Sequence, residues 1–257
     1  MNENLQGRRN IKLILAYDGT DFSGWQRQGR FKTVQGIIED ALGKIHKGPV
    51  ALNGAGRTDA GVHAAAQAAN FYTSIKDMEA GRFVPALNSL LPKDVRILEA
   101  SETAADFHAR FDARLRTYRY YFITRRDALP WEQRYAWHIS RLCKRQPDIE
   151  RLNEYARLFR GEMDCTAFAV PGDKSKSRHR YIAGASFFIE GDRLVFEISA
   201  NAFLWKMARS IAGTLLRFEE KGLSADFLRE VIESRNRQLT GPTAPPEGLF
   251  LWKVEYE

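Results

Sequence analysis

The stretch SFFIEGDRLVFEISA, residues 186–200, decides which class of sheet we expect in this chain. Residues 186–190 and 194–200 are rich in aromatic and β-branched side chains, and Gly191 and Asp192 between them are typical turn residues, so the stretch predicts a β-hairpin. Two strands joined by a tight turn run antiparallel, whereas parallel strands need a long crossover. The hairpin therefore favours a mostly antiparallel sheet.

Further strands and helices are interspersed along the rest of the chain. Strands are predicted at 11–17, about 66–73, 115–123 and 249–256. Helices are expected after the capping residues Thr33, Asp148, Asn201 and Ser224, each followed by apolar residues at helical spacing. Because few strand–helix–strand units are clean, the pattern predicts an α+β fold. We expect two packed halves, residues 1–110 and 111–257, that act as one catalytic unit.

The composition is that of an ordinary globular protein. The 257 residues are 44% hydrophobic and 28% charged, and no apolar run approaches the roughly 18 residues that span a bilayer. The first ten residues lack the apolar core of a secretory signal. Two cysteines, Cys143 and Cys165, cannot build a disulfide framework or a CxxC-type metal site. We therefore expect a reduced, cytoplasmic protein.

The charge balance points toward an anionic partner. The formal net charge is +7, and the 39 basic residues are 27 arginines and 12 lysines, accompanied by 16 Phe, 9 Tyr and 5 Trp. Arginine forks grip phosphate and flat rings stack on bases, so this composition suits a nucleic-acid-binding protein. A modest positive charge can equally serve solubility alone, and composition by itself does not decide between the two.

The segment GAGRTDAGVHA (54–64) is the strongest local candidate for a functional site. Its three glycines permit unusual backbone conformations and close approach of a ligand, and they surround Arg57, Thr58 and Asp59. The pattern GxxxxGK[ST] of a phosphate-binding loop is absent. From the residues alone, Asp59 is either a displayed functional carboxylate or a side chain that caps a tight turn.

Seven blocks of this sequence closely resemble the TruA family of tRNA pseudouridine synthases, in the family's order and from about residue 11 to residue 256. These blocks are YDGTDFSGWQRQ (17–28), TVQGIIEDAL (33–42), GAGRTDAGVHA (54–64), ALNSLLP (86–92), FHARFDARLRTYRYYF (107–122), NAFLWKMARSIAG (201–213) and APPEGLFL (244–251). One departure lies in the 201–213 block, at Trp205, Lys206, Ala208, Ser210 and Ala212.

The resemblance implies an isomerase that needs no cofactor and no metal. Its substrate would be uridine at positions 38–40 of the tRNA anticodon stem-loop, whose base it would detach at N1 and reattach to the ribose through C5. The implied fold is the pseudouridine-synthase fold, with two RRM-like αβ halves and a mostly antiparallel sheet around a central basic cleft. The implied assembly is a homodimer.

The resemblance also implies roles for four residues. Asp59 matches the catalytic aspartate, which could attack the sugar C1′ or the pyrimidine C6, or deprotonate C2′. Arg209 matches an arginine that pairs with that aspartate; a solvated helix residue or a phosphate contact is its alternative. Tyr118 matches an active-site tyrosine, although Tyr120 and Phe122 share its strand face and a buried aromatic stripe would explain all three. Arg57 matches a residue that helps to displace the target base, or it is a simple phosphate anchor.

Several other features have less specific interpretations. His63 and His108 have no second ligand at metal-binding spacing and are interpreted as structural. The basic runs 116–126 and 174–181 are interpreted as contacts to the tRNA backbone. A tRNA-binding or folding protein without catalysis is the alternative function, which the combination of Asp59, Tyr118 and Arg209 disfavours. An aspartate-dependent phosphohydrolase is weaker still, because metal ligands are lacking.

Overall fold

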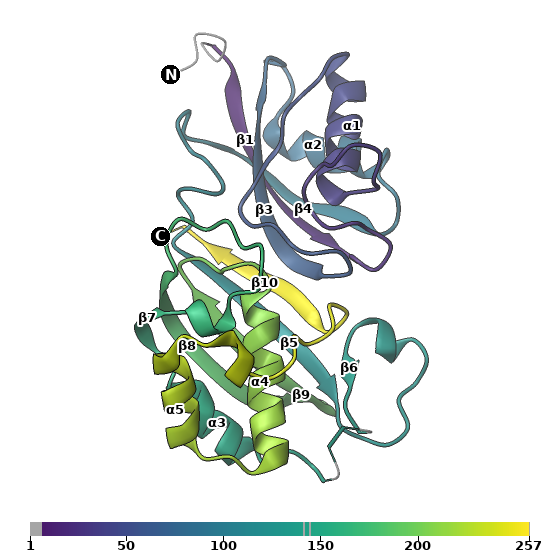
Figure 1. Cartoon of the computed structure of the whole chain (residues 1–257). Coiled ribbons are helices and arrows are strands. Elements are labelled where there is room, and N and C mark those ends of the chain that lie inside the picture. The colour runs from purple at the N-terminus through teal and green to yellow at the C-terminus, as the bar shows by residue number, and fades with distance from the viewer. Residues whose placement is uncertain (1–6, 141, 144, 257) are drawn as a thin grey trace. The chain divides into compact units, whose positions relative to one another are not determined.

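The computed structural model describes residues 7–140, 142–143 and 145–256, and Figure 1 shows the chain with its elements labelled. The chain forms two compact units. Unit 1 extends to Arg114 and also contains the chain from Leu251 onward, and unit 2 comprises Leu115–Phe250. That each unit is an RRM-like half of one catalytic body stays a prediction.

Unit 1 is a sheet with two helices. Its strands lie in the order β4–β1–β3–β10, and β1 pairs antiparallel with both β3 and β4. The strands are β1 (Arg9–Tyr17), β2 (Asn53–Gly54), β3 (His63–Thr73), β4 (Val95–Thr103) and β10 (Leu249–Glu255), and the helices are α1 (Val34–His46) and α2 (Phe83–Asn88). Alternate residues of β1 are fully buried, as in a strand with one face against a core.

The two helices of unit 1 pack on β3 through a cluster of rings. His46 at the end of α1 stacks on Phe83 of α2 at 6.0 Å, and Phe83 meets Phe71 of β3 edge-on at 5.2 Å. The start of α1 is fixed by Thr33, whose hydroxyl accepts a hydrogen bond from the Gly36 N–H at 3.3 Å. The predicted cap at Thr33 is therefore confirmed, and it sets where the preceding loop 18–32 ends.

The strands of unit 2 lie in the order β5–β9–β8–β7, and each neighbouring pair in this order is antiparallel. The strands are β5 (Leu115–Ile123), β6 (Trp137–His138), β7 (Gly161–Asp164), β8 (His179–Glu190) and β9 (Arg193–Ala200), and the helices are α3 (Ile149–Arg157), α4 (Met207–Lys221) and α5 (Ala225–Ser234). Short 3-10 helices occupy Glu132–Arg134, Thr166–Phe168 and Arg237–Leu239 in this unit, and Ala80–Arg82 in unit 1. Only the short β5–β6 pair is parallel among the pairs with described registers.

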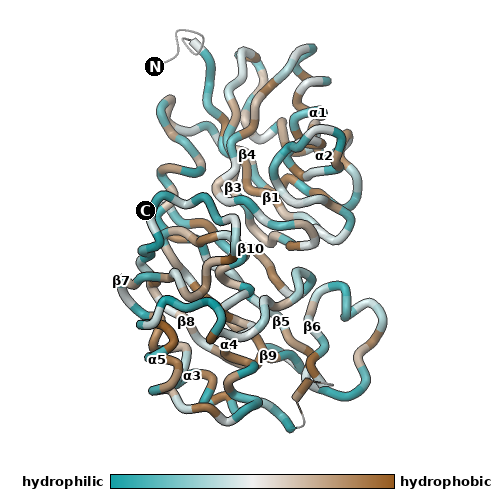
Figure 2. Tube along the Cα trace, in the orientation of Figure 1, coloured by the Kyte–Doolittle hydropathy of each residue, from teal (hydrophilic) through white to brown (hydrophobic). Residues whose placement is uncertain are grey.

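The expected α+β class with a mostly antiparallel sheet is confirmed. The predicted hairpin is β8–β9, with Gly191 in the left-handed region at φ 63°. Figure 2 shows apolar residues recurring along the strands and helices, whereas the connecting loops are mostly hydrophilic. Within the described ranges, no helix is long and apolar enough to cross a membrane.

One predicted helix boundary is wrong. Asn201 does not cap a helix, because α4 begins only at Met207 after Lys206, which adopts a left-handed conformation at φ 59°. The Asn201 side chain accepts a hydrogen bond from the Tyr181 N–H at 3.1 Å instead, and Asp173 accepts one from the Trp205 N–H. These contacts to distant residues hold 201–206 out of the helix. The caps at Asp148 and Ser224 are confirmed.

Candidate active-site residues

The loop that carries Asp59 leaves β2 and is tied at its base to β3. The Ala55 N–H donates to the Ala68 carbonyl at 2.8 Å. The fully buried Gln67 side chain donates to the Gly56 carbonyl at 2.8 Å and accepts from the Gly56 N–H at 3.3 Å. Because a buried amide satisfies both backbone groups of Gly56, the chain leaves the sheet in one defined direction.

The backbone on both sides of the Asp59 side chain is fixed by neighbouring segments. The Thr58 hydroxyl lies 2.8 Å from the hydroxyl of Tyr17 at the end of β1, and the Thr58 carbonyl accepts from the Trp25 N–H at 3.0 Å. The Asp59 carbonyl accepts from the Val62 N–H at 3.2 Å. Tyr17, Trp25 and Thr58 are all buried. The carboxylate of Asp59, which is half-buried, thus extends from a backbone that has little freedom to move.

The glycines of this region serve packing more than backbone freedom. Of the glycines in 54–61, only Gly61 has a positive φ, at 78°. A Cβ on Gly54 would lie 2.4 Å from the Trp25 ring. Gly24, in the preceding loop at φ 89°, would place a Cβ 2.7 Å from the Thr58 carbonyl oxygen. Loop 18–32 and the Asp59 loop therefore touch at backbone distance, and that contact positions Asp59.

Arg57 lies beside the catalytic candidate on the same loop and is exposed. Partial desolvation, together with the positive charge of Arg110, lowers its pKa. An exposed guanidinium group beside Asp59 can bind an anion such as a phosphate.

In unit 2, Tyr118 lies on β5 opposite Ile198 of β9. Only 8% of Tyr118 is exposed, and its ring meets the ring of Phe203 edge-on at 4.8 Å. Tyr120 on the same strand is more deeply buried and donates its hydroxyl to the Pro245 carbonyl at 2.7 Å. Burial raises the pKa of Tyr120, and its hydroxyl is already bonded to backbone.

Arg209 is the third residue of α4, and two hydrogen bonds join it to the segment that precedes β10. Its Nε donates to the Ala244 carbonyl at 2.8 Å, and the Ala244 N–H donates back to the Arg209 carbonyl at 3.1 Å. This close approach requires Gly213, since a Cβ there would lie 2.0 Å from the Pro242 oxygen. Residues 242–244 had no predicted role in the site. Gly213 and Gly241, a glycine in the helix and one in the segment, were the available signal.

The sequence of the chain matches the family model described as tRNA pseudouridine synthase over residues 13–112 and 155–257. The chain belongs to the tRNA pseudouridine synthase family. It is 55% identical to tRNA pseudouridine synthase A of Treponema denticola, over 98% of this chain and 94% of that protein. It is also 48% identical to tRNA pseudouridine synthase A of Treponema pallidum (strain Nichols), over 91% and 84% of the two chains, and 40% identical to tRNA pseudouridine synthase A 2 of Clostridium perfringens, over 96% and 100%.

The pseudouridine synthase match includes Arg57, Asp59 and Arg209, and Tyr118 falls between its two segments. The structure brings Arg57 and Asp59 together on one loop of unit 1. It places Tyr118 and Arg209 on β5 and α4 of unit 2. The roles of these four residues stay predictions.

The two histidines considered at the sequence level are bound to nearby backbone in this synthase. His63 is fully buried, and its Nδ1 accepts from the Gly19 N–H at 3.1 Å and lies 3.2 Å from the Asp18 carboxylate. The Nδ1 of His108 accepts from the Arg110 N–H at 3.1 Å. In the part of the chain that the structure describes, no cluster of three or more His, Cys, Asp or Glu could hold a metal ion.

Many cations of the two basic runs are already paired within the synthase. Arg119 contacts Glu197 at 2.7 Å and Glu190 at 2.9 Å, and Arg178 contacts Asp173 at 2.9 Å. A cation that is already paired with a carboxylate attracts a phosphate less strongly than an unpaired cation does. The interpretation of 116–126 and 174–181 as tRNA contacts stays a prediction, and these pairs weaken it.

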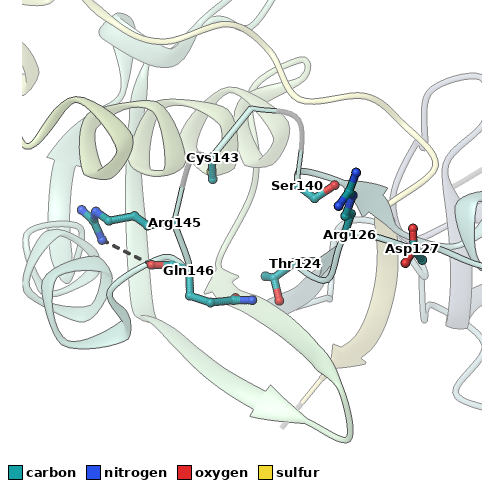
Figure 3. Close-up of a pocket in the computed structure, with 7 residues that line it drawn as sticks. All are labelled: Thr124, Arg126, Asp127, Ser140, Cys143, Arg145 and Gln146. Atoms are coloured by element: carbon teal, nitrogen blue, oxygen red, sulfur yellow. Dashed lines mark hydrogen bonds between the residues drawn. The ribbon is translucent and has the colours of Figure 1, made fainter.

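A separate polar pocket of about 640 Å³ opens in unit 2. Figure 3 shows its lining residues, which are Thr124, Arg126, Asp127, Ser140, Cys143, Arg145 and Gln146. None of the four candidate site residues lines it. We therefore assign the pocket no part in the site.

Proposed function

We propose that this protein converts uridine to pseudouridine at positions 38–40 of the tRNA anticodon stem-loop, with Asp59 as its catalytic residue and without a cofactor. The observation that carries the proposal is the fixed position of Asp59 in a chain of this family. Its loop is held by Gln67, Tyr17 and Trp25 from three different segments. A catalytic group held by rigid neighbours needs little reorganisation during the reaction.

The reaction is an isomerisation in which atoms and charges balance. The bond between N1 of uracil and C1′ of ribose breaks, a bond between C5 and C1′ forms, and the C5 proton is lost while N1 gains one. The carboxylate of Asp59 acts as a nucleophile at C1′ or C6, or as a base at C2′. All three routes need a carboxylate at a fixed place, and the loop fixes the backbone from which the Asp59 side chain extends.

Three further residues are proposed to bind the substrate. Tyr118 is proposed to stack on the target uracil, and its near-complete burial and contact with Phe203 would keep the ring in place. Arg57, exposed beside Asp59, is proposed to help displace the target base from its stack. Arg209, fixed by its two bonds to Ala244, is proposed as the cation that the family resemblance pairs with the catalytic aspartate.

The assembly and the location of the protein are proposed from the family resemblance alone. We expect a homodimer in the cytoplasm, where its tRNA substrate is found. Sedimentation at several protein concentrations tests the dimer independently of any activity.

The proposal is tested by the variant Asp59→Asn in a tritium-release assay, whose substrate is tRNA with uridine tritiated at C5. Because C5 loses its hydrogen, the wild type should release tritium to water, and Asp59→Asn should release none above background while still binding the tRNA. Asp77→Asn, which changes an exposed aspartate after β3, is the matched control and should release tritium at the wild-type rate. Normal release by Asp59→Asn would contradict the proposal. Equal RNA folding activity of both proteins without pseudouridine would favour the non-catalytic alternative.

A further inference from the structure

We infer that Phe111 and Arg110 form a nucleotide subsite on unit 1, in which Phe111 stacks on an unpaired base of the tRNA anticodon loop and the Arg110 guanidinium holds a phosphate beside it. The inference rests on the proposed function, since it names a part of the substrate that the protein would hold. Both residues lie in the segment 107–112 of the chain.

The segment 107–112 is anchored from beneath by buried polar groups. The Ala109 N–H donates to Oδ1 of Asn70 at 3.0 Å, and the Ala109 carbonyl accepts from the hydroxyl of Tyr256 at 2.9 Å. The Phe107 carbonyl accepts from the Asn10 side chain at 2.8 Å. Ala109 and Asn70 are fully buried. The segment is therefore a fixed platform on the sheet of unit 1.

Bonds within the segment turn Phe111 outward. The Phe111 N–H donates to the His108 carbonyl at 3.1 Å, and the His108 N–H donates to the Asp112 carboxylate at 2.8 Å. Phe111 remains 75% exposed, the largest fraction among the exposed large hydrophobic side chains that the structure describes. An apolar ring stabilises a fold when it is buried. The exposed Phe111 ring therefore gives its own segment no such stabilisation. An aromatic ring displayed by a rigid turn is suited to stacking.

The surroundings of Phe111 combine a flat ring with positive charge. The Arg110 guanidinium carbon lies 5.9 Å from the centre of the Phe111 ring, and the His108 ring lies 4.4 Å from it at an angle of 38°. The Arg110 charge also acts on Arg57, whose pKa it helps to lower. A guanidinium group beside a displayed ring can bind the phosphate of a nucleotide whose base stacks on that ring.

The observations favour a nucleotide over a protein partner. Proteins that recognise single-stranded or looped RNA combine aromatic stacking with arginine contacts to phosphate, and this cluster offers both within one short segment. The Arg110 charge acts on Arg57, which is two residues from Asp59 on its loop, so a nucleotide bound at Phe111 would lie near the target uridine. A second copy of the chain that covers Phe111 is the competing occupant, and the test includes it.

The first test measures binding of a short anticodon stem-loop RNA. Phe111→Ala should weaken binding about 5- to 150-fold, the range that corresponds to loss of one base stack. Phe111→Tyr should bind nearly as well as wild type, and Phe111→Leu should bind like Phe111→Ala, because leucine has no ring face. Leu98→Ala removes another large side chain of unit 1 that is 50% exposed, and it should change nothing. Arg110→Ala should reduce the slope of log affinity against log salt by about one.

The second test asks whether stacking is direct. The probe is the same RNA with 2-aminopurine at one loop position, tested position by position. Wild type and Phe111→Tyr should quench the fluorescence at one position, and Phe111→Ala should not. At saturating protein, Phe111→Ala should retain a measurable single-turnover rate, because the reacting group is unchanged.

Three results would overturn the subsite. The first is that Phe111→Ala binds the RNA as tightly as wild type, and the second is that Phe111→Leu binds it as tightly as Phe111→Tyr. The third is that Phe111→Ala dissociates a dimer in sedimentation experiments, which would identify the ring as a protein contact. Failure of the proposed function is distinct from all three. In that case the wild type would form no pseudouridine, while RNA binding would still depend on Phe111.

Discussion

Replacing Gly24 with alanine should displace the loop that carries Asp59 without touching that loop's own sequence. Gly24 has φ 89°, a conformation that residues with a Cβ rarely adopt. The added Cβ would lie 2.7 Å from the Thr58 carbonyl oxygen and 3.2 Å from the Ala60 nitrogen. Both neighbours are backbone atoms of the Asp59 loop, so relief of the contact requires movement of that loop.

The size of the effect follows from two contributions. The left-handed backbone costs about 1–2 kcal/mol for a residue with a Cβ. Loss of the hydrogen bond from the Trp25 N–H to the Thr58 carbonyl, now 3.0 Å, removes about 0.5–1.5 kcal/mol. We therefore expect the free energy of unfolding to fall by about 1.5–3.5 kcal/mol. A shift of the carboxylate by about 1 Å should lower the rate of pseudouridine formation about 100-fold.

Gly29→Ala is the matched control for this prediction. Gly29 also has a positive φ, at 45°, but nothing lies within 4 Å of the Cβ position, so it carries the backbone strain without the collision. The assay is the single-turnover rate with protein in excess, together with urea denaturation of each variant. Gly29→Ala should lose stability and keep its rate. A Gly24→Ala protein that is folded and reacts as fast as Gly29→Ala would refute the reasoning.

Further predictions concern stability and binding. Tyr17→Phe removes the hydrogen bond to the Thr58 hydroxyl and should lower the free energy of unfolding by about 1 kcal/mol in urea titrations. Arg125 and the Leu129 N–H lower the pKa of Glu132 from 4.5 to about 2, so the stability from this carboxylate is complete above pH 4.5 and is lost as the pH falls toward 2. Glu132→Gln should flatten the pH dependence of unfolding in that window; an unchanged profile would contradict this. Burial raises the pKa of the Cys165 thiol to about 12, so a thiol reagent at pH 8 should label Cys165 only after denaturation, as peptide mapping would show. Affinity for tRNA should fall steeply between roughly 50 and 200 mM salt, and a flat response would contradict binding through phosphates.

Local signals in the sequence were sufficient where the deciding contacts are local. Thr33, Asp148 and Ser224 each bond to a backbone N–H two or three residues ahead, so the cap and its helix could be predicted together. Asn201 has the same chemistry but bonds to Tyr181, twenty residues earlier in the chain. No local pattern reveals that choice, because it depends on the arrival of β8 beside it.

The candidate site shows the same division. The motif around Asp59 could be found in the sequence, and so could the alternation that puts Tyr118 and Tyr120 on one face of β5. The sequence could not show that Gly24 supports Asp59, because their contact joins segments that are more than thirty residues apart. Exposure of Phe111 was equally hidden, since aromatic residues in such a block are more often buried.

The most direct test of the central claim is to map pseudouridine in an unmodified tRNA transcript that carries uridine at positions 38, 39 and 40. The purified protein is added without metal or cofactor, and pseudouridine is located by chemical labelling and primer extension. The account predicts labelled sites confined to these positions with wild type, and none with Asp59→Asn. Absence of pseudouridine with active, folded wild type, or the same sites with Asp59→Asn, would contradict it.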